Sequence, residues 1–302
     1  MMAGKFFARA SITKTNDAVQ LSFRPRRPWK VRAGQYVYLK APAIRLLSIA
    51  ESHPFNIIWW ENGPDERAET ISILAQVQSG FTKELLCHSS DHLRVLIDGP
   101  YGEPQDTEPY DSILMICTGI GISAQLPYAK EILRRQATGG SSPRKQRVTI
   151  IWVMEKEYHS DWVCDWMDQL LEKDLENAKH ATSARTSKVS GHLKDAQLMQ
   201  NGSNMEKQEI IESVSRLLES MESSKNLSGS EVQIGRRGIQ TFGKPNLCAI
   251  INDEINTCRD KLLISVSTDS KTRDLIREFA LTKDKADYYE TEFQPSDSYV
   301  SF

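Results

Sequence analysis

The sequence predicts two domains, an antiparallel β-barrel at residues 1–105 and a doubly wound parallel-sheet domain at 108–302. In the first, short runs of β-branched and aromatic residues recur between glycines and prolines, as is typical of antiparallel barrels. In the second, apolar runs of strand length alternate with amphipathic helical patterns. Residues 178–237 are polar and lack aromatic residues, which predicts a largely disordered insert.

Composition excludes several classes of protein. The chain has 302 residues and a net charge of −2, which leaves no basic excess for binding nucleic acid. No window approaches the roughly 18 apolar residues of a membrane-spanning helix. Five cysteines lie scattered without a C-x-x-C pair, which argues against a disulfide framework and against a zinc site. We expect a cytoplasmic protein with reduced thiols, no metal site and no nucleic-acid partner.

The elements expected in the barrel are short strands and one short helix. The helix is expected at Thr82–Ser89. The strands are expected at Phe6–Thr13, Ala18–Phe23, Gln35–Lys40, Ile57–Trp60, Ile71–Val77 and Leu93–Asp98.

A basic run, Arg24–Lys30, interrupts these strands. It invites a phosphate-binding or membrane-surface interpretation. We favour a charged hairpin loop, because its two prolines forbid an amphipathic helix.

A Gly-x-Gly turn at Gly119 and Gly121 follows the apolar run Ile113–Cys117, and an amphipathic helix begins at once. Glycine lets backbone N–H groups approach a pyrophosphate, and the first helical turn, at Ile122 and Ser123, offers unpaired donors and a positive dipole end. The sequence therefore indicates a nucleotide site. A tight turn without a ligand is the alternative.

The second domain is expected to continue in the same alternating order. Trp162 and Trp166 lie at helical spacing, and we assign them to the core. Within the insert, the helical pattern of Ile210–Met221 indicates a docking patch or a marginal helix. The other elements are strands 111–117, 148–153, 262–267 and 287–293 and helices 123–136, 160–173, 246–259 and 271–280.

Several motifs in a fixed order resemble the cytosolic half of fungal ferric/cupric reductases, relatives of NADPH oxidase in the ferredoxin-reductase superfamily. This resemblance implies an FAD-binding barrel and an NADPH-binding domain, and it covers the chain outside the insert. The motifs are Gly34–Leu39, Ser52–Ile57, Gln78–Leu85, Asp98–Gly102 and Thr118–Tyr128.

Two of these motifs are expected to bind FAD. Pro54 has no N–H for a strand ladder and leaves an open strand edge, as a flavin packed against it requires. Relatives usually have Thr or Ser where Asn56 stands; the amide can still donate and accept hydrogen bonds, so this departure bears on the tuning of the flavin and not on its binding. The Gly80 turn opens a helix toward the FAD pyrophosphate, although Thr82 alone is also a common N-cap. The candidates are His53, Pro54, Phe55, Asn56, Gly80, Phe81 and Thr82.

Other positions resemble family features less closely. Arg45–Ala50 mimics a flavin signature of plant-type reductases, with Leu47 in place of the aromatic residue. A solvated loop residue is the alternative interpretation of Arg45. Phe293 resembles a terminal aromatic residue that covers the flavin in some members. Where many relatives have Cys-Gly-Pro, this chain has Ser267–Asp269, so we assign no catalytic thiol.

The residues after the second strand bear on nucleotide preference. Glu155 suits a ribose 2′-hydroxyl, whereas Lys156 suits a 2′-phosphate, and the residues alone do not choose. The family prefers NADPH, which favours Lys156 as the residue that binds its 2′-phosphate.

The resemblance implies a ferric-reductase-like flavoenzyme, in which NADPH gives a hydride to FAD and electrons leave singly. No side-chain acid, base or nucleophile is required. The acceptor is left open between a ferric chelate and the haem of a membrane domain, which relatives carry ahead of the flavin domain. This chain starts at the first barrel strand, so a truncated gene model and a place at the cytosolic face of a membrane stay open. The alternatives are a soluble diaphorase and a non-catalytic, regulatory member.

Overall fold

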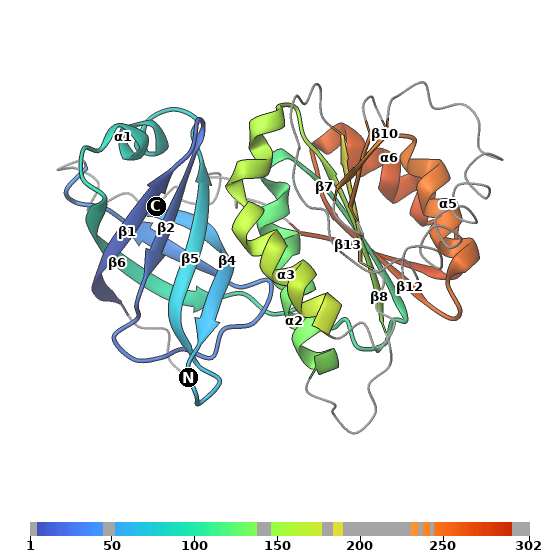
Figure 1. Ribbon diagram of the computed structural model, residues 1–302, viewed down its shortest axis with the longest axis horizontal. Helices are drawn as coiled ribbons and strands as arrows, with labels where there is room; N and C mark the ends of the chain where they lie inside the picture. Colours follow the sequence, from blue (N-terminus) through green and yellow to red (C-terminus); the bar gives the residue numbers. More distant parts are fainter. Residues whose placement is uncertain are drawn as a thin grey trace, which may run out of the picture.

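The computed structural model shows a β-barrel beside an α/β domain (Figure 1). It describes residues 5–44, 52–137, 146–176, 184–189, 231–234, 238–241 and 245–291.

The barrel closes with every neighbouring pair of strands antiparallel, as the sequence predicts. Alternating side chains such as Ala8, Ala10 and Ile12 point into it. A short helix, α1 (Phe81–Cys87), joins the last two strands. In spatial order the strands are β1 (Phe6–Lys14), β2 (Ala18–Phe23), β5 (Ala68–Gln76), β4 (His53–Asn62), β3 (Tyr36–Lys40) and β6 (His92–Tyr101).

The α/β domain has a sheet covered on both faces by helices (Figure 1). The helices α2 (Ile122–Ala137) and α3 (Cys164–Glu176) lie between the sheet and the barrel, and α5 (Leu247–Thr257) and α6 (Ser270–Ala280) lie on the opposite face. Its central strands are therefore buried on both sides and almost wholly apolar. The strand order is β10 (Glu231–Ile234), β11 (Gly238–Thr241), β9 (Ala184–Val189), β8 (Arg147–Val153), β7 (Ser112–Thr118), β12 (Leu262–Ser267) and β13 (Ala286–Glu290).

Two regions differ from the sequence prediction. Inside the expected insert, β9 pairs in parallel with β8, and β10 pairs with β11, so these stretches extend the sheet. The helix expected at 160–173 is divided into a 3-10 turn, Glu157–Trp162, and α3. The helical pattern of Ile210–Met221 lies outside the described residues.

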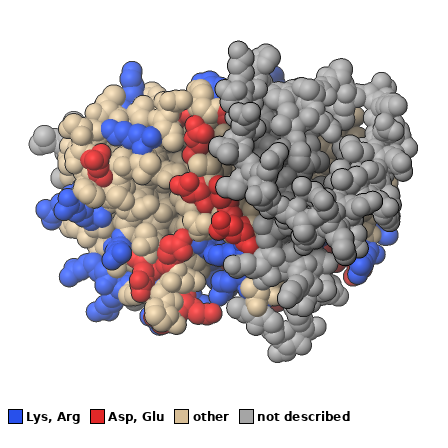
Figure 2. Space-filling view, in the orientation of Figure 1, with Lys and Arg blue, Asp and Glu red and all other residues tan. Residues whose placement is uncertain are grey.

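Charged side chains are unevenly distributed over the surface. Lys and Arg gather on the outer side of the barrel, whereas Asp and Glu form a band toward the second domain (Figure 2).

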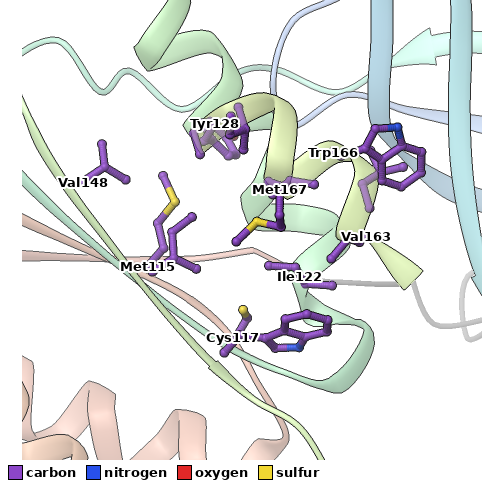
Figure 3. Packing of buried hydrophobic residues seen from close by; sticks show 14 of the residues in the cluster. Met115, Cys117, Ile122, Tyr128, Val148, Val163, Trp166 and Met167 are labelled. Carbon is purple, nitrogen blue, oxygen red and sulfur yellow. The ribbon is translucent and has the colours of Figure 1, made fainter. Parts of the chain in front are cut away.

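One hydrophobic cluster spans the two domains. Trp59 of β4 stacks with Trp166 of α3, with ring centroids 6.0 Å apart. Trp162, in the turn before α3, is fully buried. The assignment of Trp162 and Trp166 to the core is thus confirmed. Figure 3 shows Trp166 beside the barrel strands, with Met167 on the sheet side of the same helix. Polar contacts reinforce this interface, since Glu131 accepts hydrogen bonds from Arg32 Nε and from the N–H of Ala33, each at 2.8 Å. The two domains are thus held in a fixed relation.

Candidate functional site

Two sequence motifs of the barrel meet in space. His53, the first residue of β4, stacks on Phe81, the first residue of α1, with ring centroids 4.2 Å apart. The strand that contains Pro54 and Asn56 is therefore fixed against the turn that begins at Gly80.

The expected flavin-facing residues divide between the two sides of β4. Phe55 points into the barrel core with only 3% of its surface exposed, so its side chain is not available to a ligand outside the barrel. Pro54 and Asn56 lie on the outer side, opposite Tyr38 and Tyr36 of β3. The period of two along a strand explains this division.

Sequence analysis missed an aromatic group beside these residues. The rings of Tyr36, Tyr38 and Tyr101 contact one another at 5.6–5.9 Å. Tyr101 donates a hydrogen bond of 2.7 Å to Asp98, and this bond, with burial, raises the pKa of Tyr101 to about 12. The alternation of Tyr36 and Tyr38 along β3 was the available signal. Together with Pro54 they form an apolar outer surface suited to a planar ring.

The turn before α1 has open backbone. Gly80 has a φ of 60°, and no atom lies within 4 Å of the position that a Cβ would occupy. The Thr82 hydroxyl accepts a hydrogen bond of 2.9 Å from the N–H of Gln78, so it stabilises this turn, and Gly80 is the N-cap residue. The space at Gly80 fits the approach of a phosphate group.

The second candidate site lies where the order of the sheet reverses. From β7 the chain continues to β8 on one side and later to β12 on the other. Ligands of such sheets bind at the carboxyl ends of the strands beside this switch point. Gly119 follows β7 there, with a φ of 46° and no atom within 4 Å of a Cβ position. The indole Nε1 of Trp152 donates a hydrogen bond of 2.8 Å to the carbonyl of Gly119 and fixes the turn.

The other residues expected at this turn have different surroundings. A Cβ on Gly121 would collide with the carbonyl of Ser267, so this glycine permits close contact between the turn and β12. The N–H of Ile122 already bonds to the carbonyls of Gly119 and Ile120, and the Ile122 side chain is fully buried. Ser123 is 2% exposed. Of these residues, Gly119 is therefore the one whose backbone is open to a ligand.

Buried polar atoms lie beneath the turn. The Ser267 hydroxyl and the Gln125 Nε2 are buried and have no hydrogen-bond partner in the part of the chain that the structure describes. Gln125 Oε1 accepts a bond of 2.9 Å from Ser265. Unsatisfied buried polar groups are costly, so their retention fits a site for a polar ligand. The start of α6 is different, because Asp269 caps it by accepting the N–H of Thr272 at 3.1 Å.

Lys156 lies at the junction of the domains. Its Nζ is 3.8 Å from Asp17 in the β1–β2 turn, and its side chain is 53% exposed. A hydrogen bond with Tyr158, assisted by the charge of Asp17, raises the pKa of Lys156. Glu155 is exposed beside it. Phe293 and Arg45 lie outside the described residues.

Two family profiles match successive parts of the chain. The sequence profile of an FAD-binding domain matches residues 4–105, and that of a ferric reductase NAD binding domain matches residues 110–270.

Curated relatives are longer than this chain. The ferric reductase transmembrane component 5 of Saccharomyces cerevisiae is 26% identical over 277 residues, covering 88% of this chain and 35% of the relative. A putative respiratory burst oxidase homolog protein G of Arabidopsis thaliana is 25% identical over 256 residues, covering 72% of this chain and 27% of the relative. The chain thus corresponds to about a third of the first relative and about a quarter of the second.

A solved structure shares the fold. The ferredoxin NADP+ reductase of Neisseria gonorrhoeae, determined with bound FAD and NADP, superposes with a TM-score of 0.51 at 12% identity, covering 95% of this chain and 98% of that one. Among the described residues of the present chain, no helix has the length and apolar character to cross a membrane. The same residues contain no cluster of His, Cys, Asp and Glu that is suited to a metal.

Proposed function

Because the chain belongs to the ferric reductase family, as an FAD-binding domain followed by a ferric reductase NAD binding domain, we propose that it moves electrons from NADPH to FAD and then singly to an acceptor. FAD, when bound, supplies this chemistry, since a flavin accepts a hydride and releases single electrons. The terminal reaction we propose is the reduction of a ferric complex, directly or through a haem of a membrane partner at the cytosolic face.

The chain's own residues contribute binding and orientation. The outer surface of Pro54, Asn56 and Tyr38 provides a platform for the flavin ring, and the open backbone at Gly80 admits the FAD pyrophosphate. At the switch point, Gly119 admits the pyrophosphate of NADPH. Lys156 is our candidate for the 2′-phosphate.

The observation that carries the proposal is the hydrophobic cluster shared by the two domains. Hydride transfer requires two rings held at a fixed separation, and domains that moved freely could not hold it. The cluster and the bonds of Glu131 to the Arg32–Ala33 segment give the rigid relation that this reaction needs.

The test is anaerobic reduction of the purified, FAD-saturated chain. We expect NADPH to bleach the flavin absorbance, and ferricyanide or ferric citrate to restore it. A protein that retains FAD and is reduced by dithionite but by neither NADPH nor NADH would contradict the proposal and favour a non-catalytic member. Reoxidation by ferricyanide or a quinone but not by ferric citrate would favour a diaphorase.

A further inference from the structure

Three arginines form a row across the outer face of the barrel. Arg9 of β1 lies directly opposite Arg94 of β6. On the other side of β1, Ala10 pairs with Phe23, the last residue of β2, so Arg24 directly follows the paired segment on the side of Arg9. All three arginines are exposed. Like charges directly opposite destabilise a sheet, so packing does not account for this row.

An exposed apolar pair adjoins the row. Phe7 is 51% exposed, and the Arg94 guanidinium lies 4.7 Å from its ring centroid. Leu96 lies opposite Phe7 on the neighbouring strand and is partly exposed. Lys5, two residues before Phe7, exposes 67% of its side chain and pairs with Asp98 at 3.5 Å. Phe7 and Leu96 thus form a small apolar patch beside Arg94 and Lys5 on the outer face of the barrel.

The basic loop after β2 extends this surface. Trp29 contacts Phe6 edge-on at 5.4 Å on the inner side of β1, so the loop lies at the end of the barrel where β1 begins and adjoins the outer face through Arg24. Figure 2 shows Lys and Arg gathered on this outer side of the barrel. Among the described residues, the cations of the loop and of the arginine row form no ion pair. We call the surface the basic face, and it comprises Lys5, Phe7, Arg9, Arg24, Arg26, Arg27, Lys30, Arg94 and Leu96.

We propose that the basic face docks the barrel on a bilayer that contains anionic phospholipid. Guanidinium groups bind headgroup phosphates and carboxylates with paired hydrogen bonds. Clusters of this many Lys and Arg residues suit an anionic lipid surface, and an aromatic side chain between them suits its interfacial layer. A soluble polyanion matches the charges equally well but gives Phe7 no role. The proposal does not depend on electron transfer.

The experiment is co-sedimentation of the full chain with vesicles of phosphatidylcholine, alone or mixed with phosphatidylserine. The unmodified chain is expected to sediment only with the mixed vesicles. Arg9→Gln with Arg94→Gln should lower partitioning on the order of tenfold or more, from about fivefold for each charge. Phe7→Ser should lower it severalfold at unchanged charge. The matched control is Arg259→Gln with Lys285→Gln, which removes two exposed cations from the other domain.

Three results would overturn the proposal. The first is an unmodified chain that stays in solution with both kinds of vesicle. The second is equal partitioning of the Arg9/Arg94 variant and the matched control. The third is equally tight binding to heparin with no effect of Phe7→Ser, which indicates a polyanion site. Circular dichroism and thermal melting check that each variant is folded. If the Arg9/Arg94 variant does not fold, Arg26→Gln with Arg27→Gln tests the same face.

Discussion

The imidazole ring of His53 lies on the phenyl ring of Phe81, with their planes inclined by 14°. Phe81 is 4% exposed and belongs to the barrel core, so it is a rigid support for the imidazole. The contact joins β4 to α1 at the point where the proposed flavin surface meets the Gly80 turn. The stacked rings thus join two segments that lie far apart in the sequence, alongside the core packing of Phe55 and Leu85.

We expect His53→Ala to weaken FAD binding severalfold while the barrel stays folded. Stacked ring pairs contribute about 0.5–1.5 kcal/mol beyond their buried area, and losing one loosens the Gly80 turn. Fluorescence titration with FAD measures the dissociation constant, and thermal melting checks the fold. His53→Phe is the control, because it keeps the stack and should keep the affinity. Equal weakening by both variants would assign the effect to the imidazole nitrogens instead.

Gly80 and Gly119 offer a reciprocal test. Both have positive φ and open space at the Cβ position, so alanine imposes the same kind of backbone strain at each. We expect Gly80→Ala to lower FAD content. We expect Gly119→Ala to retain FAD and reduction by dithionite but to lose reduction by NADPH. Identical losses in the two variants would show that strain spreads through the fold and that neither turn is a separate phosphate site.

Periodicity made most of the fold predictable. Buried and exposed residues alternate along β1, as expected of a strand with one buried face. The apolar run of β7 is unbroken, as expected of a strand buried on both faces. The glycine turn between β7 and α2 was likewise predicted from the apolar run and the helical pattern on either side of it. The strands β9 and β10 at one end of the sheet were missed, because their short, polar sequences gain stability only from pairing with the rest of the sheet.

Local sequence could not separate the roles of the two glycines after β7. Both belong to one motif, yet Gly121 is required by contact with Ser267, which is remote in the sequence, and Gly119 by its positive φ. Which residues face each other on neighbouring strands could not be predicted either. The Tyr36–Tyr101 contact and the Arg9–Arg94 pair depend on strand register, which the sequence does not state.

Lys156 is expected to discriminate NADPH from NADH. Lys156→Gln should raise the KM for NADPH severalfold and leave that for NADH nearly unchanged, because only NADPH carries the 2′-phosphate. Glu155→Gln is the matched variant, and it should weaken NADH relative to NADPH by removing an acceptor for the ribose 2′-hydroxyl. Steady-state rates of ferricyanide reduction with each nucleotide measure both effects. If Lys156→Gln changed both nucleotides equally, the lysine would act through Asp17 on the domain interface.

Lys130 provides a prediction about the pH dependence of stability. It lies on α2 at the interface, where its Nζ donates to the carbonyl of Trp60 and lies 3.6 Å from the ring centroid of Trp59. Burial lowers the pKa of Lys130 from 10.5 to about 7, against the attraction of Glu61 and with repulsion from Lys173 and Arg134. The interface thus holds a lysine that loses its proton near neutral pH.

The sign of the effect follows from linkage. Below about pH 7 Lys130 is charged in both states, and the folded state bears the full cost of burying the charge. Between about 7 and 10.5 the folded protein releases the proton while the unfolded chain keeps it, so stability rises with pH, in total on the order of a few kcal/mol. Lys130→Met should remove this rise, whereas Lys285→Met, at an exposed position, should retain it. Urea unfolding across this pH range measures the slope, and an unchanged slope in Lys130→Met would show that the lysine keeps its proton at the interface.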